Sequence, residues 1–238
     1  MARALLLALS LFCLPALASE LKPFSASYTA DWKQLPMSGS AERSLQALDD
    51  GQWQLHFRAS MLVASLTEQS LLRPDGRDLL PQHYLYERSG LGKAKKIEQR
   101  FDWASKQVLG QDRGNAIKLP LNRGLLDKST YQLALQHDVA AGKQSMSYQV
   151  VDGDEIETYD FRVLGEEVVR TQAGMVDAVK VERVRDPTQS ARKTTLWFAK
   201  DWGHLLVRLH QVEKDGKEYQ IMLKDGTVDG KAVQGRRD

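Results

Sequence analysis

Short segments in which apolar and polar residues alternate recur along most of this 238-residue chain. The clearest of these segments lie at residues 24–32, 53–63, 96–103 and 205–209. Alternation with a period of two places the apolar side chains on one face of a β-strand. Six Asp-Gly pairs lie among these segments, and this dipeptide readily adopts the positive backbone angles of tight hairpin turns. The sequence therefore predicts an all-β, mainly antiparallel fold with a strongly curved sheet, either an open barrel or a two-sheet sandwich.

One hairpin is specified with particular clarity. Asp50-Gly51 follows a weaker strand segment over residues 41–48 and precedes a strongly alternating one. In the second segment Trp53, Leu55 and Phe57 share one face. We expect a tight turn at Asp50-Gly51, with these three side chains directed into the core.

The pattern changes to a helical one only over residues 129–141. Ser129 and Gln132 have the spacing of a capping box, and apolar residues then recur every four positions. Gly142 supplies a C-terminal stop. The sequence predicts a single helix here. The preceding stretch, 109–120, is predicted to be loop with one brief strand at 116–119.

The N-terminus has the features of a signal peptide. Arg3 precedes an apolar run over residues 4–17, and Ala16-Leu17-Ala18 provides small residues at the positions that signal peptidase requires. A membrane anchor is the alternative, but about 14 apolar residues are fewer than the roughly 20 that span a bilayer. We predict a signal peptide over residues 1–18, cleavage after Ala18 and a periplasmic mature protein.

Composition limits the mature chain further. The only cysteine, Cys13, lies inside the predicted signal peptide, and the bulky Phe12 before it disfavours lipidation. Without Arg3, 32 of the 33 basic residues remain against 31 acidic ones, so net charge gives no attraction to nucleic acid. We expect one β-rich domain over residues 19–238 without a further membrane span, and a frayed polar end from about residue 226.

No catalytic or metal-binding motif is recognisable. The histidines are scattered and lack the spacing of a metal-binding pair; they are His56, His83, His137, His204 and His210. The glycine-containing segment 89–93 lacks the spacing of a phosphate-binding loop. We therefore predict a protein that is not an enzyme and uses no metal or cofactor.

Aromatic residues on the presumed inner faces are the remaining candidates for a site. The six proposed ligand-binding residues are Trp53, Phe57, Tyr86, Phe101, Trp103 and Trp197. A curved sheet with such a lining is either filled by its own side chains or leaves an apolar cavity for a ligand. The pattern alone is compatible with both arrangements.

Several short sequence motifs, spread over nearly the whole mature chain, have a recognisable order and spacing. They are Phe24 to Tyr28, Leu80-Pro81 with Tyr84 and Tyr86, Phe101-Asp102-Trp103, Asp127 with Ser129, Tyr159 to Glu167, Gly174 to Val181, and Leu196 to Asp201. Taken together, they resemble an exported bacterial family catalogued as domain of unknown function 3108. One departure is His204-Leu205-Leu206, where the family pattern has a Leu-Pro pair. The resemblance implies a periplasmic or otherwise exported β-rich protein. It supplies no established activity or catalytic residues to carry over.

Two functional hypotheses follow. The first is a non-enzymatic periplasmic binding or carrier protein for an apolar or amphipathic envelope component, such as a lipid or glycan. The second is a solid-core interaction module that binds an envelope protein through a sheet edge or a loop. An enzyme acting on envelope glycan or lipid would need a buried acid or histidine pair that the sequence does not display.

Overall fold

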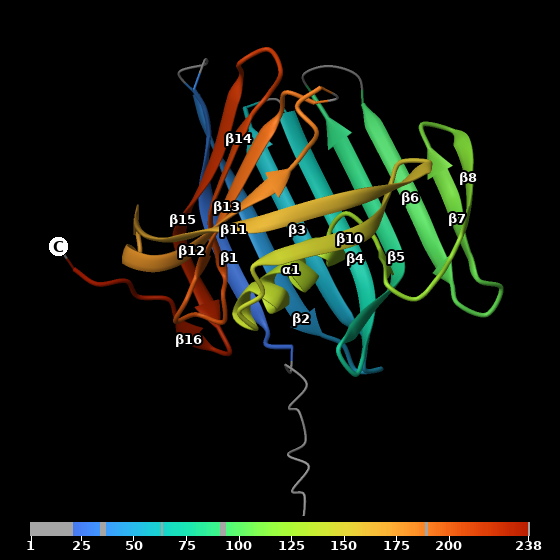
Figure 1. Cartoon of the computed structure of the whole chain (residues 1–238), viewed down its shortest axis with the longest axis horizontal. Coiled ribbons are helices and arrows are strands. Elements are labelled where there is room, and N and C mark those ends of the chain that lie inside the picture. The colour runs from blue at the N-terminus through green and yellow to red at the C-terminus, as the bar shows by residue number, and fades with distance from the viewer. Residues whose placement is uncertain (1–20, 34–36, 63, 91–93, 189, 238) are drawn as a thin grey trace, which may run out of the picture.

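The computed structural model describes residues 21–33, 37–62, 64–90, 94–188 and 190–237. The predicted signal peptide and its cleavage site lie outside these residues, as do residues 91–93 of the glycine-containing segment. The described chain forms one 16-stranded sheet and one helix (Figure 1). The predicted all-β fold with a single helix is confirmed.

The strands follow one another closely along the chain. Their bounds are β1 Phe24–Trp32, β2 Met37–Ala47, β3 Trp53–Met61, β4 Ala64–Asp75, β5 Asp78–Ser89, β6 Lys95–Asp102, β7 Gln107–Asp112, β8 Asn115–Pro120, β9 Leu125–Leu126, β10 Ser145–Asp152, β11 Glu155–Thr171, β12 Gly174–Val184, β13 Lys193–Ala199, β14 Leu206–Val212, β15 Glu218–Val228 and β16 Lys231–Ala232. The helix α1 spans Thr130–Ala140, between β9 and β10.

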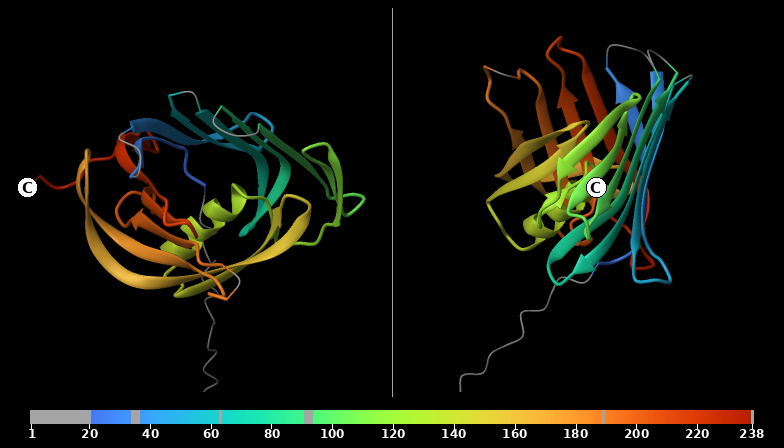
Figure 2. Two further views of the ribbon diagram at one scale, coloured as in Figure 1. Left: turned by 90° about the horizontal axis from the view of Figure 1, so that it is seen from above. Right: turned by 90° about the vertical axis from the view of Figure 1, so that its right-hand side faces the viewer.

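Two antiparallel meanders make up the sheet. One runs from β1 to β8 and the other from β10 to β15, and the pairing of β1 with β15 joins them. The short β9 adds a parallel strand beside β10, and β16 pairs with β15. The joined sheet curves strongly, so that the two meanders face each other with α1 between them (Figure 2).

The helix lies inside this curve because several of its faces are apolar. Leu133 packs in a core cluster with residues of β1 to β4. Leu135 and Val139 pack in a second cluster with residues of β10 to β14. A third cluster, formed mainly by β5 to β9, contains Tyr84 and Phe101. The helix therefore fills the space between the two halves of the sheet.

The predicted hairpin at Asp50-Gly51 is confirmed. β2 and β3 pair with Ala47 opposite Trp53, and Gly51 has a φ of +76°. Leu55 is buried, while Trp53 and Phe57 are half-buried and pack against the first cluster.

The prediction of loop over residues 109–120 is wrong, apart from the brief strand at 116–119, which lies within β8. This stretch lies in the β7–β8 hairpin, where Arg113-Gly114 forms the turn with positive φ at both residues. Only Val108 and Ile117 face the core as buried residues, which leaves too few apolar positions for a clear alternating pattern. Gly110 is needed here, because an added Cβ would lie 1.9 Å from the Glu98 carbonyl oxygen.

The C-terminal residues are also better ordered than predicted. β15 continues through Asp225-Gly226 to Val228, so this Asp-Gly pair lies inside a strand. Val233 is buried, and Arg236 forms a backbone bridge with Met175 and an ion pair with Asp177. The segment expected to be frayed from about residue 226 therefore packs against β12 and β15.

Candidate functional site

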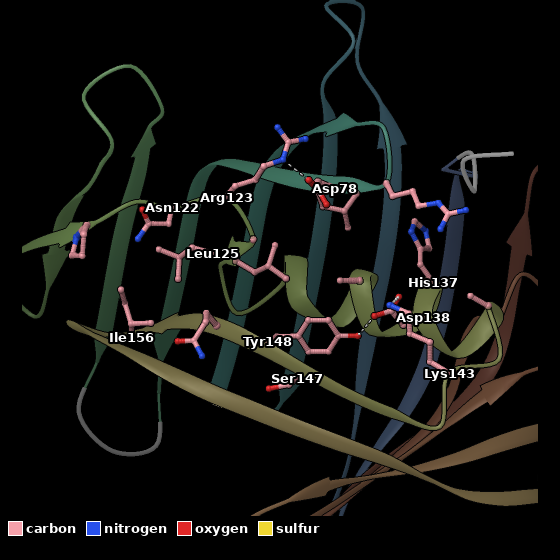
Figure 3. Close-up of a pocket in the computed structure, with 18 residues that line it drawn as sticks. Asp78, Asn122, Arg123, Leu125, His137, Asp138, Lys143, Ser147, Tyr148 and Ile156 are labelled. Atoms are coloured by element: carbon pink, nitrogen blue, oxygen red, sulfur yellow. Dashed lines mark hydrogen bonds and ion pairs between the residues drawn. The ribbon is translucent and has the colours of Figure 1, made fainter. Parts of the chain in front are cut away.

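A partly open cavity of about 750 Å³ lies beside α1. Its walls come from the start of β5, the segment between β8 and α1, the helix itself, β10 and the start of β11 (Figure 3). The lining residues are Arg77, Asp78, Leu79, Pro120, Asn122, Arg123, Gly124, Leu125, Leu126, Ala134, His137, Asp138, Ala141, Lys143, Ser147, Tyr148, Gln149 and Ile156. The cavity thus depends on α1 being held against both halves of the sheet.

One face of the helix forms part of the wall. Ala134, His137, Asp138 and Ala141 line the cavity at the i, i+3, i+4 and i+7 spacing of a single helical face. The two alanines leave open space that larger residues would fill, and His137 and Asp138 provide polar groups. Ala134 on this face also packs against the first core cluster.

The two ends of the cavity carry different side chains. Figure 3 shows His137, Asp138 and Lys143 toward one end, Leu125, Ile156 and the polar Asn122 toward the other, and Tyr148 between them. Such a division suits a ligand with one polar and one apolar part.

Asp138 organises the polar end. Its carboxylate accepts a hydrogen bond of 2.8 Å from the Tyr148 hydroxyl and forms an ion pair of 2.7 Å with Lys143. Burial and the adjacent carboxylate together raise the pKa of Tyr148, so the phenol keeps its proton. Burial lowers the pKa of His137, which favours a neutral imidazole at pH 7.

A second set of charges lies where the β4–β5 turn meets the segment before β9. The Arg123 guanidinium donates to Asp78 at 2.5 Å and to Asp75 at 2.7 Å. These exposed ion pairs connect the turn to the segment that leads into β9 and α1.

A buried polar network anchors the N-terminus of α1 deeper in the protein. The Asp127 carboxylate accepts hydrogen bonds from the backbone amides of Ser129 and Thr130 at 2.8 and 2.7 Å. It also accepts from the hydroxyls of Thr130 at 2.8 Å and of Ser70, on β4, at 2.6 Å. Asp127 therefore provides the cap that the sequence assigned to Ser129, whose side chain makes no capping bond. The network connects the helix to the first meander.

Glu68 extends this network with a second carboxylate. Its carboxylate accepts hydrogen bonds of 3.3 Å from Tyr84 and from Ser129, and among the described residues no lysine or arginine forms an ion pair with it. Burial raises the pKa of Glu68 above its usual value near 4.5.

The raised pKa of Glu68 predicts a pH-dependent stability. The folded state takes up a proton at Glu68 more readily than the unfolded state, so this group stabilises the fold at low pH. Its contribution falls as the pH rises from about 4.5 through the raised native pKa. Glu68→Gln removes the titration. In urea unfolding from pH 4 to pH 8, the stability of wild type relative to Glu68→Gln should decrease with pH; an increase would contradict this assignment.

None of the six aromatic residues proposed from the sequence lines the cavity. Trp53, Phe57 and Trp197 belong to the first cluster, whereas Tyr86, Phe101 and Trp103 belong to the third. The Trp103 indole donates to the Pro81 carbonyl at 2.8 Å. The Trp197 indole donates to Glu167, and the Lys180 and Arg208 cations lie 5.3 and 4.4 Å from its ring centroid. The structure places these aromatics in packed regions and separates them into two groups.

The cavity residues had only a partial signal in the sequence. The helix and its period were recognisable, and they place Ala134, His137, Asp138 and Ala141 on one face. No local pattern indicates that Arg77 or Tyr148 would lie opposite this face, because both belong to distant parts of the chain. No cluster of three or more potential metal ligands occurs among the residues that the structure describes.

Comparisons with known proteins place the fold among uncharacterised β-barrel-like proteins. A Brucella abortus crystal structure, described as a β-barrel-like protein of domain of unknown function DUF1849, matches with a TM-score of 0.58 and 11% identity. The match covers 87% of this chain and 98% of that one, and the low identity restricts the likeness to the fold. A "putative lipoprotein" from Parabacteroides distasonis matches with a TM-score of 0.31 and 13% identity, over 87% of this chain and 96% of that one.

The search of curated proteins gave no match. In the described part of the chain, no helix combines the length and apolar character that a membrane crossing requires. The family model for the protein of unknown function DUF3108 matches residues 27–224, which include all of the cavity residues. The chain therefore belongs to the DUF3108 family.

Proposed function

We propose that this protein is a non-enzymatic binding or carrier protein that holds an apolar or amphipathic envelope component in the cavity beside α1. The observation that carries the proposal is the cavity of about 750 Å³, which is lined by both apolar and polar side chains. Small-molecule sites typically have volumes of about 300–1,000 Å³ and combine apolar walls with a few polar groups. A cavity with these properties supports a ligand-binding protein over an interaction module with a solid core.

The arrangement of polar groups supports binding rather than catalysis. His137 and Asp138 are adjacent in the helix, where neighbouring side chains do not face each other. The Asp138 carboxylate is already occupied by Tyr148 and Lys143, so it is not positioned to orient the imidazole as a general base. Groups held in this way can recognise a ligand without changing it.

The N-terminal sequence supports a periplasmic location. A basic residue, an apolar run over 4–17 and the Ala16-Leu17-Ala18 motif are typical of a cleavable signal peptide. A protein exported in this way would meet lipids, glycans and envelope proteins. The cavity favours the first two classes of ligand over a protein partner.

The substitution Ala141→Trp tests the cavity. Ala141 is exposed at the end of α1 and lines the cavity, so an indole there should obstruct the cavity without disturbing the core. Binding can be followed with the apolar dye 1-N-phenylnaphthylamine and its displacement by fatty acids. In wild type, dodecanoate should displace the dye at lower concentration than decanoate, by about 4-fold per additional buried methylene. Ala141→Trp should weaken both dye and fatty acid binding by about 10-fold or more, since the indole occupies ligand space.

Ala140→Trp provides the matched control. Ala140 is also exposed, lies one position earlier in α1 and does not line the cavity. The Ala140→Trp variant should bind dye and fatty acid as wild type does, and its melting temperature should be similar to that of wild type. Equal loss of binding in both variants, or no saturable binding by wild type, would remove the support for the cavity. The interaction-module hypothesis would then be the better one.

A further inference from the structure

Resting on the proposed function, we infer that the ligand carries an anionic head group, a carboxylate or a phosphate, which the Arg77 guanidinium and the His137 imidazole recognise at the rim of the cavity. The ligand class is thereby narrowed to single-chain anionic amphiphiles. The head group is indicated by the cavity-lining charges that are not already neutralised within the protein.

Most charged residues of the cavity wall have a partner of opposite sign. Arg123 pairs with Asp78 and with the neighbouring Asp75. Lys143 pairs with Asp138, whose second oxygen accepts the Tyr148 hydroxyl. These contacts satisfy both carboxylates that line the cavity and two of its three permanent cations.

Arg77 is the remaining cation. It lies at the β4–β5 turn and lines the cavity, and within the described part of the chain it has neither an ion pair nor a hydrogen bond. A guanidinium presents five N–H donors in a planar fork that matches carboxylate and phosphate oxygens. Arg77 is therefore the one lysine or arginine of the cavity lining that forms no ion pair with a carboxylate among the described residues.

His137 adds a neutral donor from another wall. It lines the cavity from α1, and its ring has no hydrogen-bond partner among the described residues. Because burial lowers the pKa of His137, the ring is neutral at pH 7 and still offers one N–H donor. A guanidinium and an imidazole N–H that line the same cavity can together bind the oxygens of one anionic group.

The end of the cavity away from His137 sets the other part of the ligand. Leu125 and Ile156 line the cavity there, together with the polar Asn122 (Figure 3). An alkyl chain would extend toward them from a head group held at the rim. A small inorganic anion would leave this end empty, which favours an amphiphile over free phosphate.

The test compares probes that share one alkyl chain and differ in head group. Dodecanoate, dodecyl phosphate and dodecanol are used to displace 1-N-phenylnaphthylamine from wild type, Arg77→Gln and Arg73→Gln at pH 7. Arg73 is the matched control because it is exposed on the same hairpin but lies outside the cavity. Wild type and Arg73→Gln should bind at least one anionic probe about 10-fold or more tightly than dodecanol, as expected for a charge-assisted contact.

In Arg77→Gln this preference should fall to less than about 3-fold, while dodecanol binding is unchanged. Whichever anionic probe binds more tightly identifies the head group as carboxylate or phosphate. Equal binding of all three probes by wild type would overturn the head-group inference and leave the carrier proposal intact. An anion preference that survives in Arg77→Gln would overturn it as well. If none of the three probes binds wild type, the carrier proposal itself fails.

Discussion

Asp127→Ala is expected to destabilise the protein by about 3–5 kcal/mol, because it removes the acceptor shared by several buried donors. The Asp127 side chain is fully buried and accepts four hydrogen bonds, two from backbone amides and two from hydroxyls. Alanine would leave the two backbone amides and one of the two hydroxyls without an acceptor in a region closed to water, since Ser70 and Thr130 can still bond to each other. Each unsatisfied buried group costs about 1–3 kcal/mol. Loss of the helix cap contributes a further part, typically about 1 kcal/mol. Urea unfolding at pH 7 measures the change.

Two further variants test whether the loss of stability comes from the lost hydrogen bonds of Asp127. Asp127→Asn keeps the shape and one acceptor oxygen, and the Ser70 and Thr130 hydroxyls can rotate to accept from the new amide. It should therefore lose much less stability than Asp127→Ala. Asp154→Ala, at an exposed aspartate in the β10–β11 turn, should stay within about 0.5 kcal/mol of wild type. A loss below about 1 kcal/mol in Asp127→Ala would show that the four donors find other partners.

This network also explains how much of the helix could be predicted. The four-residue spacing of Tyr131, Leu135 and Val139 is a local signal, and the helix was found within one residue at each end. The cap was assigned to Ser129 because a capping box is also a local motif. The hydroxyl of Ser70 that fixes Asp127 comes from β4, 57 residues earlier. A contact at this separation leaves no local pattern.

The strands show the same division between local and distant information. The β2–β3 hairpin was predictable because Asp50-Gly51 and the alternation after it are adjacent in the chain. The pairing of β1 with β15, which joins the two meanders, brings together the two ends of the described chain. Period-two alternation identifies each of these strands, but it does not indicate which strand pairs with which.

The candidate site was the least predictable part. Aromatic residues were chosen because they combine large apolar area with positions on inner faces, and those properties also suit a packed core. The structure uses Phe101 and Trp197 in this way, with 4% and 3% of their surface exposed. The cavity instead lies where small residues such as Ala134 and Ala141 face short strands and turns. A small side chain indicates a cavity only when the residues on the opposite side of that space are known.

Arg43→Met is expected to stabilise the protein by about 1–4 kcal/mol, the gain seen when buried ionic groups are replaced by apolar residues of similar volume. Arg43 lies on β2 with 3% of its surface exposed. Its one hydrogen bond, to the Gln136 side chain, is 3.5 Å long, and its guanidinium carbon lies 5.1 Å from the centre of the Phe24 ring. Nη2 has no partner in the described part of the structure, and burial lowers the pKa of the group. The unbranched methionine side chain can occupy the same apolar space without a charge to desolvate.

Arg58→Met is the control for the loss of a positive charge, because Arg58 is exposed on the neighbouring strand β3 and should change stability by less than about 0.5 kcal/mol. Destabilisation by Arg43→Met would instead mean that the buried charge has a stabilising partner. Glu68 is the candidate, since its carboxylate favours the charged form of Arg43 through the interior. A double-mutant cycle of Arg43→Met with Glu68→Gln then decides between the two accounts. A coupling energy above about 1 kcal/mol would identify a stabilising interaction across the core. Additive effects would leave Arg43 as an unpaired charge that the fold tolerates at a cost in stability.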